Sequence, residues 1–422
     1  MSNQVSKYMP RIMDTLLDQR LQSIGAILIT GPKWCGKTRT GMFHSKSQVY
    51  IDDPLTRERA LLAPEFVLDG AYPRLIDEWQ EVPQLWDKAR RLIDDAAGRG
   101  MFIFTGSATP GQDPSHTGTG RFARLMMRPM SLYESGHSTG HVSLSGLFSG
   151  EPIIPQPSEI GIKQVIELIC RGGWPASVHD PLESALEVPR DYIESIISSD
   201  ITRVNGVGRN PDKVRLLLRS LARNNATTAK MTVLRNDVSE REEGEDLSLD
   251  SVRSYLDALK RIYMIDEQEA WLPGLRSKKR IRTSPKRHFI DPSLAVAALN
   301  ATPGMLFEDL KTTGFLFESL CYRDLCVYAQ PIRARVCHYR DNEDLEADAI
   351  IQHPDGRWGA VEVKLGRHQW DQAAVTLIRL SRKIAADGGG KPSFLMILTA
   401  VGDVAYTRED GVHIVPIGSL KD

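Results

Sequence analysis

Residues 31–38, GPKWCGKT, decide the fold of this 422-residue chain. They follow an apolar run at 26–30, AILIT, and match the pattern GxxxxGK[ST]. The glycines permit a loop whose backbone N–H groups converge on phosphate oxygens, and the next helix adds the partial positive charge of its N-terminus. The alternative is a glycine turn without a ligand. The predicted nucleotide-binding residues are Gly31, Pro32, Lys33, Trp34, Cys35, Gly36, Lys37, Thr38 and Arg39.

A pair of acids is expected to complete this site. Lys37 would reach the β- and γ-phosphates of ATP, and the Thr38 hydroxyl would ligate Mg²⁺. The run RLIDEWQ at 74–80 ends a second apolar strand with Asp77 and Glu78. We expect Asp77 to hold Mg²⁺ through water and Glu78 to polarise the attacking water. Adjacent acids are also common on surfaces, but their place in the alternating pattern favours this role.

The next strand, FIFTGSAT at 102–109, ends in hydroxyl residues. A polar side chain there would sense the γ-phosphate, and Ser107 is the first candidate, with Thr105 second. The alternative is a strand-ending turn at Gly106.

The first 160 residues alternate strand-like and helical runs. Strands are expected at 26–30, 49–52, 74–76 and 101–105, with helical segments between them, for example at 82–97. This alternation predicts βαβ units and a parallel sheet.

Composition excludes several classes of protein. The chain has 53 Lys and Arg against 54 Asp and Glu, which argues against a globally basic nucleic-acid binder. Five cysteines without a CxxC pair argue against a disulfide framework or zinc ribbon. Apolar runs are too short to span a membrane, and the N-terminus lacks the apolar region of a signal peptide. We therefore expect a soluble cytoplasmic protein.

Helical patterns at 211–223, 227–236 and 249–262 precede strand-like runs at 263–271 and 282–290. Three helices and two strands are the order of a winged helix–turn–helix. A basic run lies at the expected wing and predicts contact with DNA phosphates. The alternative is a solvated hairpin that touches only protein. The run comprises Arg276, Lys278, Lys279, Arg280, Arg282, Lys286 and Arg287.

Four polar residues mark the C-terminal part. Glu318 lies in a helical segment, Asp348 in EADAII, and Glu362 and Lys364 in AVEVKLG. Glu362 and Lys364 face the same side of a strand, and a hairpin would bring Asp348 beside Glu362. Asp348 and Glu362 could then ligate Mg²⁺, with Glu318 approaching from the helix and Lys364 orienting water.

The order GPKWCGKT, LIDEWQ, FIFTGSAT and GRFARLMMRPMSLYESG resembles AAA+ ATPases of bacteria and archaea. GGWP at 172–175 resembles their lid motif, so the resemblance places Pro175 near the adenine. It also implies a homo-oligomeric ring, with a hexamer as one candidate, and an arginine finger acting in trans. Arg121 is the first candidate, followed by Arg124 and Arg128; the alternative is an arginine that only pairs an acid such as Glu134.

The C-terminal set resembles the PD-(D/E)xK nuclease superfamily, and the same domain accompanies this AAA+ branch. SPKRHFIDPSLAVAAL, FLFESL and VEVKLG match it, so the resemblance spans nearly the whole chain. Because fold does not fix function, an inactive module that binds DNA or protein remains the alternative.

These observations predict an α/β protein with four parts. They are a P-loop AAA+ core at 1–160, a helical lid at 161–208, a winged helix at 209–292 and a restriction-nuclease-like domain at 300–422. The expected function is Mg²⁺-dependent ATP hydrolysis acting on DNA, with a metal-dependent nuclease domain. The alternative is an ATP-driven signalling or toxin–antitoxin-like switch whose C-terminal domain binds protein and does not cut DNA.

Overall fold

The computed structural model describes residues 8–106, 118–158, 160–201, 208–239, 248–273 and 284–422. Two compact units emerge from it. The first is built mainly from the chain up to Pro129, with the short segment Ala258–Met264. The second is built mainly from Met130–Asp200, Arg209–Asp257 and Ile265–Asp422. The expected division into four parts stays a prediction.

The first unit is a parallel sheet between helices. Its described strands are β1 (Ala26–Thr30), β2 (Ser47–Tyr50), β3 (Arg74–Asp77), β4 (Phe102–Thr105) and β5 (Phe122–Met126), in the order β2-β3-β4-β1-β5. Its helices are α1 (Met13–Ser23), α2 (Lys37–Phe43), α3 (Pro54–Leu62), α4 (Pro64–Leu68) and α5 (Gln84–Ala96). All the strand pairs are parallel, as the alternation predicted. The edge strand β5 was missed because its FARLM sequence lacks an apolar run.

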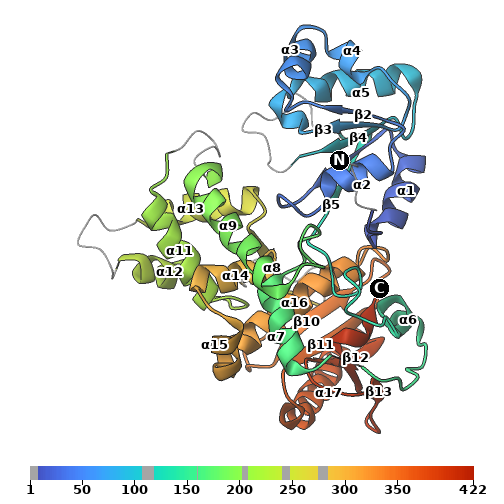
Figure 1. The fold of residues 1–422 in the computed structure, drawn as a ribbon. Coiled ribbons are helices and arrows are strands. Elements are labelled where there is room, and N and C mark those ends of the chain that lie inside the picture. Colours follow the sequence, from blue (N-terminus) through green and yellow to red (C-terminus); the bar gives the residue numbers. More distant parts are fainter. Residues whose placement is uncertain (1–7, 107–117, 159, 202–207, 240–247, 274–283) are drawn as a thin grey trace. The chain divides into compact units, whose positions relative to one another are not determined.

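Both faces of this sheet are buried, and each side has its own apolar cluster. Ala26 and Leu28 pack with Trp86 and other residues of α5. Ile27 and Ile29 point the other way, into a cluster that includes Leu17 of α1. Figure 1 shows α3, α4 and α5 on one side of the sheet and α1 and α2 on the other. This two-sided burial explains why the strands read as continuous apolar runs.

The second unit begins with short elements and helices. They are β6 (Val142–Ser143), α6 (Leu144–Ser149), α7 (Ile162–Arg171), α8 (Leu182–Ala185), α9 (Glu187–Ser195) and the π-helical turn η2 (Ile196–Asp200). Next come α11 (Pro211–Arg223), α12 (Met231–Ser239), α13 (Leu249–Arg261) and the antiparallel strands β7 (Ile265–Gln268) and β8 (Lys286–Phe289). Three helices and two strands thus occur in the predicted order, and the winged helix stays a prediction. Helix α12 starts later than expected because Thr227 forms a β-bridge with Arg287.

The C-terminal part is a mixed sheet with helices. Its elements are α14 (Pro292–Leu299), α15 (Pro303–Glu308), α16 (Leu310–Tyr328), β9 (Arg335–Arg340), β10 (Glu346–Gln352), β11 (Trp358–Lys364), α17 (Trp370–Ala386), β12 (Phe394–Thr399), β13 (Tyr406–Thr407), β14 (His413–Pro416) and β15 (Leu420–Lys421). The strand order is β13-β14-β12-β11-β10-β9. Leu377 and Leu380 of α17 pack with Trp358 and Ile350 in its core, while α16 contacts β9 and β11.

A buried ion network holds distant parts of the second unit together. Arg323 of α16 donates from Nη1 to Asp291 Oδ2 at 2.8 Å and from Nη2 to Asp324 Oδ1 at 2.7 Å. Asp291 in turn accepts from the backbone N–H of Gly173 at 3.0 Å, and Asp324 accepts from the backbone N–H of Leu132 at 3.0 Å. The motif residues that the sequence placed in separate domains therefore meet in one structural network.

Candidate functional site

The phosphate loop has the backbone shape that its glycines permit. Gly31 has φ 144°, and a Cβ added there would lie 2.1 Å from the Met127 carbonyl oxygen. Gly36 has φ 103° and caps α2, which begins at Lys37. The buried Arg11 guanidinium donates to the backbone oxygens of Cys35 at 2.8 Å and Arg128 at 2.7 Å. These contacts anchor the loop to the segment after β5.

The buried Lys37 ammonium folds back onto its own loop. Its Nζ donates to the carbonyl oxygens of Gly31 at 3.0 Å and Pro32 at 2.6 Å. A nucleotide phosphate would offer this ammonium a charged acceptor in place of two neutral ones, and charge-assisted hydrogen bonds are the stronger kind. The loop therefore fits a triphosphate, with Lys37 already inside it.

Asp77, at the end of β3, accepts hydrogen bonds from helix α2 and from the end of β4. The Thr38 hydroxyl donates to its Oδ1 and Oδ2 at 3.0 and 3.1 Å, and the Thr105 hydroxyl also donates to Oδ1. Thr105 can do so because β4 lies between β1 and β3 in the sheet. Burial raises the pKa of Asp77, and the hydrogen bonds from Thr105 and Thr38 oppose that rise. A hydroxyl and a carboxylate side by side are oxygen ligands that fit Mg²⁺, directly or through water.

Glu78 follows in a left-handed backbone conformation, with φ 52°. The Gln80 side-chain amide donates to its carboxylate. Burial raises the pKa of Glu78, and the negative charge of Asp77 adds to that rise while the Gln80 hydrogen bond opposes it. Trp79 packs against Trp86 directly behind it, so the turn that presents Glu78 is held from the core side.

The remaining predicted nucleotide-site residues fall in different places. Trp34 has φ 62° and is 54% exposed, Arg39 is exposed, and Lys33 is half-buried. Ser107 lies outside the described residues, whereas the second candidate, Thr105, bonds to Asp77. Pro175 is half-buried in the second unit, where neighbouring Trp174 donates from Nε1 to Ser293 Oγ at 3.0 Å.

The finger candidates also differ in environment. Arg121 is about half exposed and donates from Nε to Asp94 Oδ1 at 2.7 Å. Its partner in the structure is therefore Asp94 and not Glu134, which accepts a hydrogen bond from the Ser131 N–H at 2.9 Å. Arg124 is exposed and Arg128 is buried.

The C-terminal candidates lie together in the second unit. Strands β10 and β11 are antiparallel with Ala349 opposite Val361, so Asp348 and Glu362 are neighbours across the ladder. Asp348 Oδ2 accepts from the Val363 N–H at 2.8 Å. The Lys364 Nζ lies 3.3 Å from Asp348 Oδ2 and 2.5 Å from Glu362 Oε2.

A second lysine, Lys286 of β8, completes the group. Its Nζ lies 2.8 Å from Glu318 Oε1, 3.1 Å from Glu346 Oε1 and 3.4 Å from Asp348 Oδ1. Only 5% of this side chain is exposed. Below, the acid–lysine cluster means Lys286, Glu318, Glu346, Asp348, Glu362 and Lys364. The sequence placed Lys286 in a DNA-binding run, but the structure buries it among carboxylates.

The charges of the acid–lysine cluster shift each other's pKa values. Burial, with the nearby charge of Asp348, raises the pKa of Glu318 to about 7 and that of Glu362 to about 8. Burial also opposes the charge of Asp348, but the two lysines prevail and lower its pKa to about 2. Asp348 is thus the carboxylate that both lysines hold in its charged form.

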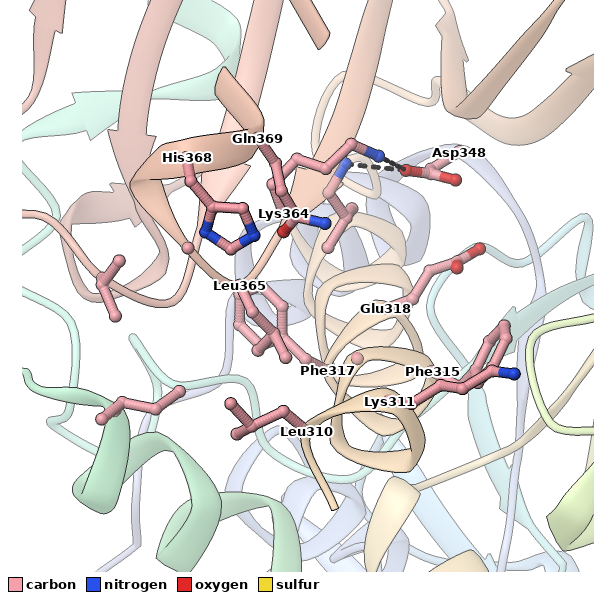
Figure 2. A pocket seen from close by; sticks show the side chains of 15 residues that line it. Leu310, Lys311, Phe315, Phe317, Glu318, Asp348, Lys364, Leu365, His368 and Gln369 are labelled. Atoms are coloured by element: carbon pink, nitrogen blue, oxygen red, sulfur yellow. Dashed lines mark hydrogen bonds and ion pairs between the residues drawn. The ribbon is translucent and has the colours of Figure 1, made fainter. Parts of the chain in front are cut away.

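Two cavities reach this cluster. One has a volume of about 480 Å³ and is lined by Thr227, Arg340 and all six cluster residues. The other has a volume of about 720 Å³ and is more apolar. Figure 2 shows this larger cavity, with Glu318, Phe315 and Lys311 on one helix and Asp348 and Lys364 on the opposite side. The cluster is therefore open to small solutes.

The cluster does not fit a divalent cation in this arrangement. Mg²⁺ needs free carboxylate oxygens about 2.1 Å away, and an ammonium beside it would repel it. Both oxygens of Asp348 already accept from lysine or backbone donors. Within the described ranges, no group of three His, Cys, Asp or Glu side chains is arranged to hold a metal ion.

The predicted DNA-binding run is only partly described. Arg276, Lys278, Lys279, Arg280 and Arg282 lie outside the described residues. Arg287 lies in β8, where its Nη1 donates to the Ala229 carbonyl oxygen at 2.7 Å and its Nε lies 3.4 Å from Glu267 Oε1.

Two important residues carried no local signal in the sequence. Arg11 is one of many arginines, and only the fold places it against the phosphate loop. Lys286 looked like part of a charged run, and although it falls within the expected strand at 282–290, no apolar alternation marks a buried face there.

Three family models match different parts of the chain. Residues 23–136 match an AAA domain, 162–304 a domain of unknown function (DUF8612) and 313–420 another domain of unknown function (DUF4143). Uncharacterized proteins of Mycobacterium bovis and Mycobacterium tuberculosis are each 24% identical over 354 residues, which cover 82% of this chain and 72% of theirs.

Two solved structures with some similarity come from archaea. The Walker-type ATPase of Pyrococcus abyssi is 14% identical, with a TM-score of 0.45, over 69% of this chain and 96% of that one. The ORC2 protein of Aeropyrum pernix is 11% identical, with a TM-score of 0.32, over 73% and 97%.

Among the helices that the structure describes, none has the length and apolar character needed to cross a membrane.

The α/β fold class is confirmed, with a P-loop core whose parallel sheet is flanked by helices and a second sheet in the C-terminal part. The AAA match contains the phosphate loop, Asp77 and Thr105, which the fold brings together. The chain therefore contains an AAA domain, followed by a DUF4143 domain.

Proposed function

We propose that this protein is a Mg²⁺-dependent ATP hydrolase that acts on DNA. The observation that carries the proposal is the convergence on Asp77, where hydroxyls from the phosphate loop and from β4 meet one buried carboxylate. The strand order, with β4 between β1 and β3, places Thr105 beside Asp77. The same edge of the sheet carries Lys37 and Glu78.

Each residue then has a definable task. Bound ATP supplies the phosphoanhydride, and Mg²⁺ neutralises charge on its phosphates. Lys37 exchanges the Gly31 and Pro32 carbonyls for phosphate oxygens. Thr38 and Asp77 hold the cation, while Glu78 orients water and accepts its proton. The raised pKa of Glu78 suits proton acceptance, because it brings this carboxylate closer to the operating pH.

Hydrolysis by site variants tests this assignment. Lys37→Ala and Glu78→Gln should each lower the rate by about 10²–10³-fold, the loss typical of one charge-stabilising group. Glu78→Gln should still bind a fluorescent ATP analogue, because the amide keeps the shape of the side chain. The exposed Lys46 is a matched control, and Lys46→Ala should hydrolyse ATP like the wild type. Unchanged hydrolysis by Lys37→Ala would remove the assignment.

The DNA part of the proposal rests on the basic run between β7 and β8. Five of its basic residues, between 276 and 282, follow three helices and lie between the paired strands. Binding through phosphates loses affinity as salt rises. We expect the wild type to bind duplex DNA in this way and a variant with Arg276, Lys278, Lys279, Arg280 and Arg282 changed to Gln to bind about tenfold or more weakly. Equal binding by both proteins would contradict DNA contact here.

A homo-oligomer is part of the same proposal. The Arg121 side chain is 45% exposed in the first unit, where it bonds to Asp94 and to the Thr119 carbonyl oxygen. In an assembly it could turn to a neighbour's nucleotide. Mixing Lys37→Ala with Arg121→Ala protein should then restore some hydrolysis, because mixed assemblies contain a site with both groups. Sedimentation in the presence of ATP gives the assembly size.

One observation favours a second candidate for the C-terminal part. Because lysines already neutralise the acids, this part fits a switch module that binds a partner without cutting DNA. A cleavage assay with Mg²⁺ or Mn²⁺ decides between the two candidates. Cleavage that disappears in the double variant Glu362→Ala, Lys364→Ala would establish the nuclease, and no cleavage by the wild type would favour the switch.

A further inference from the structure

The acid–lysine cluster contains an ammonium where a cation-binding site would have its ion. Lys286 Nζ lies within 3.4 Å of oxygens from three carboxylates on two different elements, α16 and β10. An ammonium has three N–H donors, so these oxygens can use all of them. Lys286 therefore makes the set of contacts that a bound cation would make.

The position of Lys286 is fixed from both ends. Its backbone belongs to β8, which pairs with β7 through the register Gln268 opposite Lys286. The Gln268 side chain, in turn, donates to the Asp348 carbonyl oxygen at 2.9 Å. Strand β8, which carries the lysine, is thus linked through β7 to β10, which carries Glu346 and Asp348.

Lys364 completes the neutralisation from the other side. It contacts Glu362 and the second oxygen of Asp348. Two lysines nonetheless face four acids, and burial raises the pKa values of Glu318 and Glu362. The surplus of acid is the reason that removing one lysine should leave carboxylates able to take another cation.

We propose that Lys286 is the resident cation of the acid–lysine cluster: its ammonium occupies the position between Glu318 and Asp348 that a divalent ion would take, and it excludes such an ion from the cluster. Lys286 is a positioning and blocking residue, and the cluster gains a metal site when this ammonium is removed. The inference concerns the second unit alone and stands independently of ATP hydrolysis by the first.

Mn²⁺ binding to the nucleotide-free full chain tests the proposal, with free Mn²⁺ followed by electron paramagnetic resonance. Wild type and Asp348→Asn should give the same titration, because the cluster takes no metal while Lys286 is present. Lys286→Met should gain an Mn²⁺ site at least about tenfold tighter than any wild-type site. Lys286→Arg keeps the positive charge and should gain none, and adding Asp348→Asn to Lys286→Met should abolish the new site.

Two results would overturn the proposal. The first is an Mn²⁺ site in the wild type that disappears in Asp348→Asn. The second is a folded Lys286→Met protein, judged by circular dichroism, that gains no site. If Lys286→Met folds only when Mn²⁺ is added, and the double variant with Asp348→Asn does not, the proposal is supported. If Lys286→Met does not fold at all, the comparison of the wild-type and Asp348→Asn titrations still decides whether the cluster binds Mn²⁺.

Discussion

The phosphate-loop site and the acid–lysine cluster use the same residue types in opposite ways. In the first, Lys37 bonds to backbone carbonyls, and Asp77 accepts from hydroxyls. In the second, Lys286 and Lys364 lie directly on the carboxylates. Lysine and acid in one site therefore do not define a metal centre. What matters is whether the ammonium rests on the acids or on neutral oxygens that a ligand can replace.

The largest expected difference between these regions is in folding stability. Lys286→Met should lower the free energy of unfolding by about 3–5 kcal/mol, because it leaves buried carboxylates without a counter-charge. Lys37→Met should lower it by only about 1 kcal/mol, since the partners of Lys37 are neutral carbonyls. Urea unfolding without metal or nucleotide measures both. Equal losses would mean that the two lysines play the same electrostatic role.

The pH dependence of folding stability tests the electrostatics of the acid–lysine cluster. Glu362 has a pKa of about 8 in the folded chain, against an ordinary value of 4.5, so the folded state holds this proton to higher pH. Stability should therefore fall as pH rises between those two values, and Glu318 adds to the fall up to about pH 7.

Glu362→Gln removes one of these protons from the balance. From about pH 5 to pH 8 the free energy of unfolding of Glu362→Gln should fall by about 1–3 kcal/mol less than that of the wild type. Over this range Asp348 stays charged, because its pKa is about 2. Urea unfolding at several pH values gives the slopes, with Glu409→Gln, at an exposed position, as the matched control. A Glu362→Gln slope as steep as the wild-type slope would contradict the assigned role of burial.

The smallest expected effect tests the hydroxyls around Asp77. Thr105→Val removes one donor but leaves Thr38, so ATP hydrolysis should fall by about tenfold, the equivalent of one hydrogen bond to a charged group. Thr30→Val is the control, because the Thr30 hydroxyl donates to a backbone carbonyl oxygen, that of Leu125, at 3.5 Å. Steady-state hydrolysis measures both. A loss in the control as large as that in Thr105→Val would show that the effect comes from general distortion.

The sequence predicted the phosphate-loop fold well because its signals are local. GPKWCGKT and the strand before it span residues 26–38, and the apolar runs mark strands that are buried on both faces. The order of the strands is not local. Sequence reasoning could therefore not show that β4, between β1 and β3, brings Thr105 to Asp77, and the preference for Ser107 stays a prediction.

The acid–lysine cluster shows where such reasoning ends. Spacing alone suggested that Asp348 and Glu362 would be neighbours, since one hairpin joins them. Lys286 reaches them from a strand some 60 residues away, and charge alone made it look like part of a solvent-facing run. Burial of a lysine depends on which strands pair and which helix covers them. A charged run in the sequence shows neither the strand pairing nor the helix that covers the strands.

The network around Arg323 has a consequence for how this protein can be divided. Leu132 donates to Asp324, and β6 near residue 142 pairs with β15 at residues 420–421. A fragment that ends before the C-terminal sheet would strip the stretch after Met130 of its hydrogen-bond partners. The parts of this chain can consequently not be exchanged independently of one another. A recombination event that replaced the last hundred residues would also have to supply hydrogen-bond partners for the segment near residue 130.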